Sequence, residues 1–425
     1  MARSNGAPRR RLPEIDDFND FHYEEREERM QRPSFTRENH RPLPKANKNV
    51  HVNTVDPTVY LTVTMLVIIG VVMVFSASYQ MAAIRPVFGN NPFFFLREHG
   101  IFAVAGFIAM NIISRISPQY IKNFAFVMYV VTLGLLVAVI VFGIAVGGAG
   151  RWIELPVIGR FQPSEISKAT LIFMLAFMVD KYPNALKTWT NLIIYVGVVG
   201  IVVGLILIPG GFSTALIVGT VGIAMIFVAS HHVWRFIVPG GLGVALVGGY
   251  LWFDMVAGGG FRGARVQAWM DPWSDYLGVG FQTIQSLYAV ATGGWFGLGI
   301  GQSRQASFIP EPQNDMIFAI IVEELGLLGA SLILILFGIF IWRGIVIAMN
   351  AHDTFSSMVA IGIVFAIAFQ MIINVAVVTN TIPNTGVTLP FISYGGTSLM
   401  VSMAMAGVLL SISRYSKIDN KKTRS

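Results

Sequence analysis

Residues 59–76 read VYLTVTMLVIIGVVMVFS, and no charged side chain interrupts them. This is close to the length of a membrane-spanning helix, because about 20 apolar residues cross the hydrocarbon core of a bilayer. Nine comparable runs follow, so that the ten lie at residues 59–76, 101–113, 124–146, 171–179, 192–208, 214–229, 236–253, 316–342, 358–378 and 398–412. The pattern predicts an all-α, polytopic membrane protein with about ten transmembrane helices.

Two of these runs, 101–113 and 171–179, are too short to cross a bilayer by themselves. Each becomes long enough if its helix takes in the polar residues that precede it, 93–100 and 165–170. The second extension brings Glu165 and Lys168 into the membrane. Charged residues inside a membrane helix are costly, so we interpret this helix as a functional candidate.

The composition excludes a water-soluble single-core domain. Hydrophobic residues make up 54% of the 425 residues and charged residues only 12%, about half the share in soluble domains. The 30 Lys and Arg exceed the 23 Asp and Glu by 7, and we attribute this excess to cytoplasmic loops rather than to nucleic-acid binding. The chain has no cysteine, which excludes disulfides, thiolate catalysis and cysteine-ligated zinc.

The sequence divides into three parts. Residues 1–57 mix proline with charges of both signs and predict a disordered cytoplasmic tail, because they have too little apolar surface to fold. Residues 58–414 form the predicted transmembrane domain, and residues 415–425 a basic cytoplasmic tail. Basic residues near helix ends occur on alternate connections, so we expect both termini in the cytoplasm and the residues 254–314 in a large extracellular loop.

That loop is about 60 residues long, and connections of this length are usually functional. Residues 281–291, FQTIQSLYAVA, have helical apolar spacing. Residues 293–301, GGWFGLGIG, leave two interpretations open: their glycines let the backbone approach a ligand, or they pack as a re-entrant turn.

Five segments together resemble one family. They are RVQAWMDPWSDYLGVGFQTIQSLYAVATGGWFGLGIGQSRQ (265–305), PEPQNDMIFAIIVEELG (310–326), PNTGVTLPFISYGGTS (383–398), RWIELPVIGRFQPSEISK (151–168) and MVFSASY (73–79). They resemble the SEDS family, the shape, elongation, division and sporulation glycosyltransferases. The resemblance runs from about residue 56 to 415 and is greater to the division and sporulation branches than to the elongation branch.

The resemblance implies a ten-helix enzyme of the bacterial cytoplasmic membrane that polymerises lipid II into glycan strands on the outer face, in septal cell-wall synthesis. It implies a class B penicillin-binding transpeptidase and other cell-division membrane proteins as partners. A divalent cation such as Mg²⁺ is expected beside the diphosphate, although the sequence shows no dedicated metal site.

Asp315 is the predicted general base, because it ends the outer loop just before an apolar run. From position alone a helix N-cap is the better interpretation, and the match to PEPQNDMIF favours catalysis. The predicted substrate-binding residues are Arg151, Trp152, Glu165, Lys168, Arg265, Gln285, Ser286, Glu311 and Ser393.

Several of these residues have a structural alternative. Glu165 and Lys168 lie three positions apart and could pair only to lower the cost of burial. Trp152 could be an interfacial anchor. Glu323 and Glu324 are expected to serve structure before catalysis, and packing is favoured for the SYGG residues that begin at Ser393.

Three function classes are compatible with this pattern. The first is a processive glycosyltransferase, the second a lipid II flippase or transporter, and the third a non-catalytic scaffold that recruits a transpeptidase. A flippase needs a polar path across the whole membrane, whereas the distinctive polar residues gather on one side. A scaffold does not need an acid and several cations at the ends of different helices. Both observations favour the glycosyltransferase.

Overall fold

The computed structural model describes residues 54–146, 149–155, 159–183, 186, 188–230 and 261–416. Within these ranges, eight helices are long and apolar enough to cross a membrane. They are α2 (Pro57–Ile84), α3 (Phe94–Ile113), α4 (Pro118–Phe142), α6 (Trp189–Leu207), α7 (Phe212–Ala229), α11 (Ile317–Met349), α12 (Thr354–Val378) and α13 (Gly396–Arg414). The all-α, polytopic membrane class is confirmed.

Helix α5 (Pro163–Lys181) accounts for a ninth predicted span, since it carries Glu165 and Lys168 into the bundle. The predicted extensions of the two short apolar runs are both confirmed, because α3 begins at Phe94 and α5 at Pro163. The tenth predicted span, 236–253, lies outside the described residues. So do residues 1–53 of the predicted tail and residues 417–425 at the other end.

Local sequence signals explain where several helices begin. The Asp56 carboxylate accepts hydrogen bonds from the backbone N–H groups of Thr58 and Val59, and Pro57 occupies the first turn of α2. Ser117 caps α4 in the same way, again before a proline. These caps stabilise helix ends whose N–H groups have no partner within the helix.

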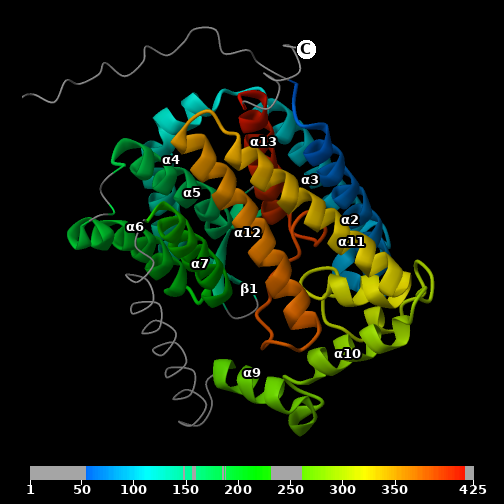
Figure 1. Ribbon diagram of the computed structural model, residues 1–425. Helices are drawn as coiled ribbons and strands as arrows, with labels where there is room; N and C mark the ends of the chain where they lie inside the picture. Colours follow the sequence, from blue (N-terminus) through cyan, green and yellow to red (C-terminus); the bar gives the residue numbers. More distant parts are fainter. Residues whose placement is uncertain are drawn as a thin grey trace, which may run out of the picture. The chain divides into compact units, whose positions relative to one another are not determined.

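Helices α12 and α13 lie in the middle of the membrane bundle (Figure 1). Helix α12 packs against α5, α7, α11 and α13, while α13 packs mainly against α3. The outer loop contributes α9 (Phe261–Met270), the 3-10 turn η3 (Pro272–Asp275), α10 (Phe281–Gly293) and the 3-10 turn η4 (Gln305–Ser307). The helix predicted at residues 281–291 is therefore confirmed as α10.

A small antiparallel sheet follows α4 and was not predicted from the sequence. Its strands are β1 (Ile144–Val146), β2 (Ala149–Leu155) and β3 (Gly159–Phe161), in the order β1-β2-β3. Ile153 of β2 lies opposite Phe161 of β3. The sheet carries Arg151 and Trp152 on its middle strand and leads into α5.

Helix α11 is broken at Gly326, whose φ of 67° and ψ of −171° lie outside the helical region. Residues 294–299 run beside the break. The Leu298 N–H donates to the Glu323 carbonyl at 2.9 Å, and the Leu327 N–H donates to the Gly294 carbonyl at 2.9 Å. A Cβ at Gly297 would overlap the Glu324 carbonyl. Gly293 and Gly297 therefore allow close approach to α11, as the packing interpretation expects, and approach to a ligand stays a prediction.

Replacing Gly326 by alanine should lower the midpoint of thermal unfolding of the purified protein. Its positive φ strains any other residue, and a Cβ there would overlap the backbone of Trp295 and Gly297. The matched control is Gly338→Ala in the same helix, where a Cβ meets open space. That variant should unfold at the wild-type temperature or slightly above it, since alanine favours a helix by about 0.5–1 kcal/mol. Equal midpoints for both variants would contradict the role assigned to Gly326.

Candidate active site

Asp315 lies just before α11 and is half-buried. The N-cap of α11 is Met316, so the capping alternative for Asp315 is wrong. The main-chain carbonyl of Asp315 accepts a hydrogen bond of 2.7 Å from the Asn374 side-chain amide of α12. The same amide donates to the Val387 carbonyl at 2.7 Å, and Asn374 is fully buried. This amide therefore holds the backbone of the acid against the α12–α13 connection.

Polar groups from the outer loop and from the α12–α13 connection lie near the Asp315 carboxylate. Gln282 Nε2 of α10 lies 3.5 Å from Asp315 Oδ1, at the limit of a hydrogen bond. The Asn384 amide donates to Gln282 Oε1 at 3.1 Å, and Arg265 Nη1 of α9 donates to the Asn384 carbonyl at 3.2 Å. The charges of Arg265 and Glu311 both act on the carboxylate. The structure thus brings together three of the predicted site residues, Asp315, Arg265 and Glu311.

Burial raises the pKa of the Asp315 carboxyl to about 6. The charge of Arg265 and the Gln282 hydrogen bond oppose this change, whereas the charge of Glu311 adds to it. A carboxylate with this pKa is mostly ionised at neutral pH and still binds a proton readily. Both properties suit a general base.

Lys168 is a second buried charge, with only 1% of its surface exposed. Its Nζ lies 2.7 Å from Glu165 Oε2 and donates to Gln370 Oε1 of α12 at 2.9 Å. Gln370 in turn donates to the Thr388 carbonyl at 2.9 Å. The pairing expected as the structural alternative is therefore present, and contact of Lys168 with substrate stays a prediction.

Gln370 and Asn374 of α12 connect the two charged groups. They lie four residues apart, so they occupy the same helix face, about 6 Å apart along the axis. Gln370 holds Lys168 and Asn374 holds Asp315. Sequence reasoning missed both amides. Two amides at helical spacing inside the apolar run 358–378 were the signal that could have revealed them.

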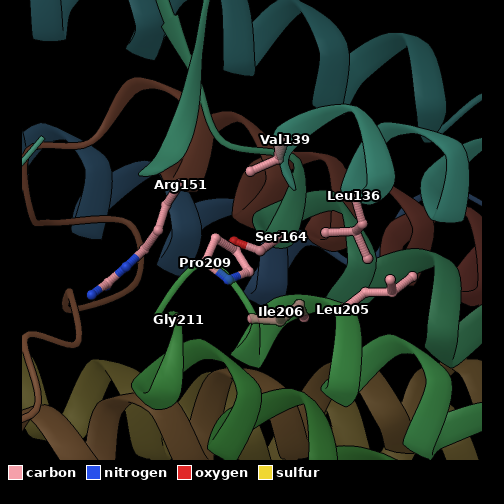
Figure 2. Close-up of a pocket in the computed structure, with 8 residues that line it drawn as sticks. All are labelled: Leu136, Val139, Arg151, Ser164, Leu205, Ile206, Pro209 and Gly211. Carbon is pink, nitrogen blue, oxygen red and sulfur yellow. The ribbon is translucent and has the colours of Figure 1, made fainter. Parts of the chain in front are cut away.

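Arg151 and Trp152 lie on β2, and Arg151 lines a small cleft shown in Figure 2. Figure 2 shows the Arg151 side chain extending away from the apolar side chains of Leu136 and Leu205. The lining residues are Leu136, Val139, Arg151, Ser164, Leu205, Ile206, Pro209 and Gly211. Neither Asp315 nor Lys168 is among them, so this cleft does not join the predicted site residues.

Three of the remaining predicted residues form hydrogen bonds with nearby groups, and the fourth is half-buried. Ser286 donates to the Val378 carbonyl at 2.9 Å, and Ser393 accepts from the Leu389 N–H at 2.7 Å. Both serines are buried and stabilise the backbone around them. Gln285 is half-buried on α10, and Glu311 is exposed and accepts from the Asn314 amide at 2.6 Å.

Glu323 and Glu324 hold the end of the outer loop, as expected of residues with a structural role. Glu323 accepts from Ser303 Oγ at 2.5 Å and from the Arg304 N–H at 3.1 Å. Glu324 accepts from Ser76 Oγ of α2 at 2.6 Å. The pair therefore ties α11 to the loop and to α2.

In the part of the chain that the structure describes, no three His, Cys, Asp or Glu side chains gather into a metal-binding group. Mg²⁺ commonly binds through one or two carboxylates together with substrate phosphates. The exposed carboxylate of Glu311 could supply one such ligand, and the divalent cation stays a prediction.

The helices and this polar site define the class, a multi-pass membrane protein with charged residues held between its helices. The chain belongs to the SEDS family, because the family model for FtsW, RodA and SpoVE, described as "Cell cycle protein", matches residues 57–418.

Relatives cover most of the chain. "Stage V sporulation protein E" of Bacillus subtilis is 40% identical over 359 residues, which are 83% of this chain and 95% of that protein. "Probable peptidoglycan glycosyltransferase FtsW" of Trichlorobacter lovleyi is 38% identical over 367 residues, 85% of this chain and 94% of that protein.

Two solved structures share the fold. A chain from a study of polymerization and crosslinking by a peptidoglycan synthase complex aligns with a TM-score of 0.70 and 27% identity, covering 86% of this chain and 99% of that one. RodA of Thermus thermophilus aligns with a TM-score of 0.63 and 24% identity, covering 85% and 98%.

Removing one partner of the buried Glu165–Lys168 pair should destabilise the protein more than removing both. Glu165→Gln leaves the buried ammonium without its carboxylate, at a cost of about 3–5 kcal/mol. The double variant Glu165→Gln/Lys168→Met contains no uncompensated charge and should recover most of that loss. Thermal unfolding of the wild type, the two single variants and the double variant measures the difference.

The matched control is the partly exposed pair of Lys122 and Asp180, whose charged atoms lie 2.5 Å apart. Lys122→Met should change the stability by less than about 1 kcal/mol, because water screens this pair. The assignment is wrong if the double variant is as unstable as Glu165→Gln.

Proposed function

We propose that the chain is a peptidoglycan glycosyltransferase that polymerises lipid II on the outer face of the cytoplasmic membrane, in septal cell-wall synthesis. The observation that carries this proposal is Asp315, a half-buried carboxylate whose backbone is fixed by Asn374 and whose pKa is raised to about 6. The name "Probable peptidoglycan glycosyltransferase FtsW" supports the reaction, and the family description "Cell cycle protein" supports a role in the cell cycle.

In the proposed reaction, Asp315 takes the proton from a sugar hydroxyl of one lipid-linked unit. The hydroxyl oxygen bonds to the anomeric carbon of the second unit while the bond from that carbon to the diphosphate oxygen breaks. The polyprenyl diphosphate then leaves with its electrons, and nearby cations stabilise its charge. A bound Mg²⁺ would contribute to the same neutralisation, with Glu311 as a candidate ligand.

The burial of each cationic side chain decides whether it is proposed to contact the diphosphate. Arg265 is half-buried beside Asp315 and is proposed to contact the diphosphate, with Arg151 as a second contact. Lys168 is buried and paired, so we assign it the role of a fixed charge. The double variant Glu165→Gln/Lys168→Met tests this role, because a stable but inactive protein supports it and an active one refutes it.

The proposal includes an orientation and a partner. In the proposed orientation both termini are cytoplasmic and α9 and α10 lie outside, which the basic residues on alternate connections support. A class B penicillin-binding transpeptidase is proposed to cross-link the glycan, since the related chain solved in a peptidoglycan synthase complex belongs to a study of polymerization and crosslinking.

Asp315→Asn should abolish glycan synthesis from lipid II by the purified protein with its transpeptidase. Asparagine preserves the size of the side chain and the backbone bond to Asn374, but it does not accept a proton at neutral pH. The control is Asp271→Asn, because Asp271 is an exposed residue of the same loop that only caps η3. Near-normal polymer from a folded Asp315→Asn protein refutes the assignment of the base.

The rate of polymerisation should also depend on pH through Asp315. With a pKa of about 6, kcat/KM should fall about tenfold for each pH unit below 6 and level off above it, because only the ionised carboxylate accepts the proton. Gln282→Leu removes a hydrogen bond that favours the ionised form, so the inflection should move to higher pH.

Gln285→Leu is the matched control for this pH profile, since it is the same substitution on the same helix. It should leave the inflection where it is, whatever it does to the rate. An inflection that Gln282→Leu does not move shows that another group titrates.

A further inference from the structure

Residues 294–301, GWFGLGIG, form an apolar loop that faces outward from the bundle. Its side chains other than glycine are Trp295, Phe296, Leu298 and Ile300, and they are 66%, 82%, 39% and 57% exposed. The segment contains no charged side chain and no hydroxyl or amide side chain. An exposed apolar patch of this kind marks a surface that contacts a membrane or another protein.

Several backbone groups of the apolar loop are hydrogen-bonded to α11 and α2. The N–H groups of Leu298 and Gly299 donate to the Glu323 and Glu324 carbonyls, each at 2.9 Å. The Gly294 and Trp295 carbonyls accept from the N–H groups that follow the break in α11, at 2.9 and 3.2 Å. Gly301 N–H donates to Ser76 Oγ of α2 at 2.8 Å. Irregular backbone at membrane depth is tolerated where it is buried against protein, and these bonds hold the backbone of the loop against α11 and α2.

Two helices give the depth of the loop. Arg343 of α11 and Asp56 before α2 form an ion pair of 2.8 Å, which marks one boundary of the hydrocarbon core because charges are costly within it. From Asp56 to Ser76 the chain rises by about 30 Å, and from Arg343 back to Gly326 by about 26 Å. The core is about 30 Å thick, and helix tilt shortens both distances. The loop contacts Ser76 and Gly326 and therefore lies at or inside the opposite boundary.

The exposed faces of the neighbouring spans continue from the loop. Leu328, Leu332 and Ile335 of α11 are 51–58% exposed, on the part of the helix that follows the break. Tyr79 of α2 is exposed three residues beyond Ser76. The loop side chains thus belong to the surface that the membrane-spanning helices present to lipid.

We propose that the apolar loop is embedded in the membrane and that Trp295, Phe296, Leu298 and Ile300 contact the acyl chains of the leaflet on the active-site side. The loop also helps to set the depth of Asp315 relative to the membrane. The residues just after it donate to the Glu323 side chain, and Glu323 lies eight residues from Asp315, about 12 Å along the helix. The loop therefore couples the depth of Asp315 to the acyl chains.

The absence of cysteine in the sequence allows a direct test. Phe296→Cys and, separately, Ile300→Cys are labelled with a nitroxide in the full-length protein in lipid nanodiscs. Collision with oxygen, which concentrates in the acyl region, is compared with collision with a water-soluble nickel chelate. Leu332→Cys on α11 serves as the lipid reference, and Ser274→Cys on the exposed turn η3 serves as the water reference.

The oxygen-to-nickel ratio at positions 296 and 300 should match that at 332 and exceed that at 274. A ratio equal to that at 274 places the loop in water and overturns the proposal. Poor accessibility to both reagents shows that protein covers the loop, and it overturns the assignment of lipid as well. Both side chains are exposed, so these variants should fold, and a melting temperature equal to that of the wild type confirms it.

Discussion

The bilayer allows no unpaired backbone polar group in its core, and the active-site end of this protein is built around that constraint. Helix α11 stops being helical at Gly326, which leaves carbonyl and N–H groups without partners inside the helix. The outer loop returns to supply them through residues 294–299. Such close pairing of two backbones requires glycine at positions 297 and 326, because a Cβ at either would overlap the other chain.

The break separates a short first part of α11 from the long span, and the acid lies just before this short part. Residues 317–324 are all buried, so their position is fixed by packing on every side. Asn374 fixes the start of the segment with one amide that satisfies two carbonyls. Without that amide, each buried carbonyl would cost about 1–3 kcal/mol. Since Gln370 holds Lys168 from the same face, α12 sets the spacing between the acid and the buried cation.

The sequence predicted the spans well because lipid imposes one strong pattern, a long apolar run. It even located α5, because the run 171–179 is too short to cross a bilayer unless its helix takes in residues 165–170. The break at Gly326 was hidden, since the apolar pattern continues through it. Gln370 and Asn374 were missed for a related reason. An amide is tolerated in an apolar helix when a carbonyl faces it, and only the fold shows which loop supplies that carbonyl.

The groups around Asp315 explain how a half-buried acid stays ionised at neutral pH and still binds a proton readily. Arg265 favours the ionised form, yet burial outweighs it, and the pKa rises to about 6 instead of falling below the usual value. The Gln282 hydrogen bond also favours the ionised form, and the charge of Glu311 opposes it. The proton affinity of Asp315 is therefore set by burial and Glu311 on one side and by Arg265 and Gln282 on the other.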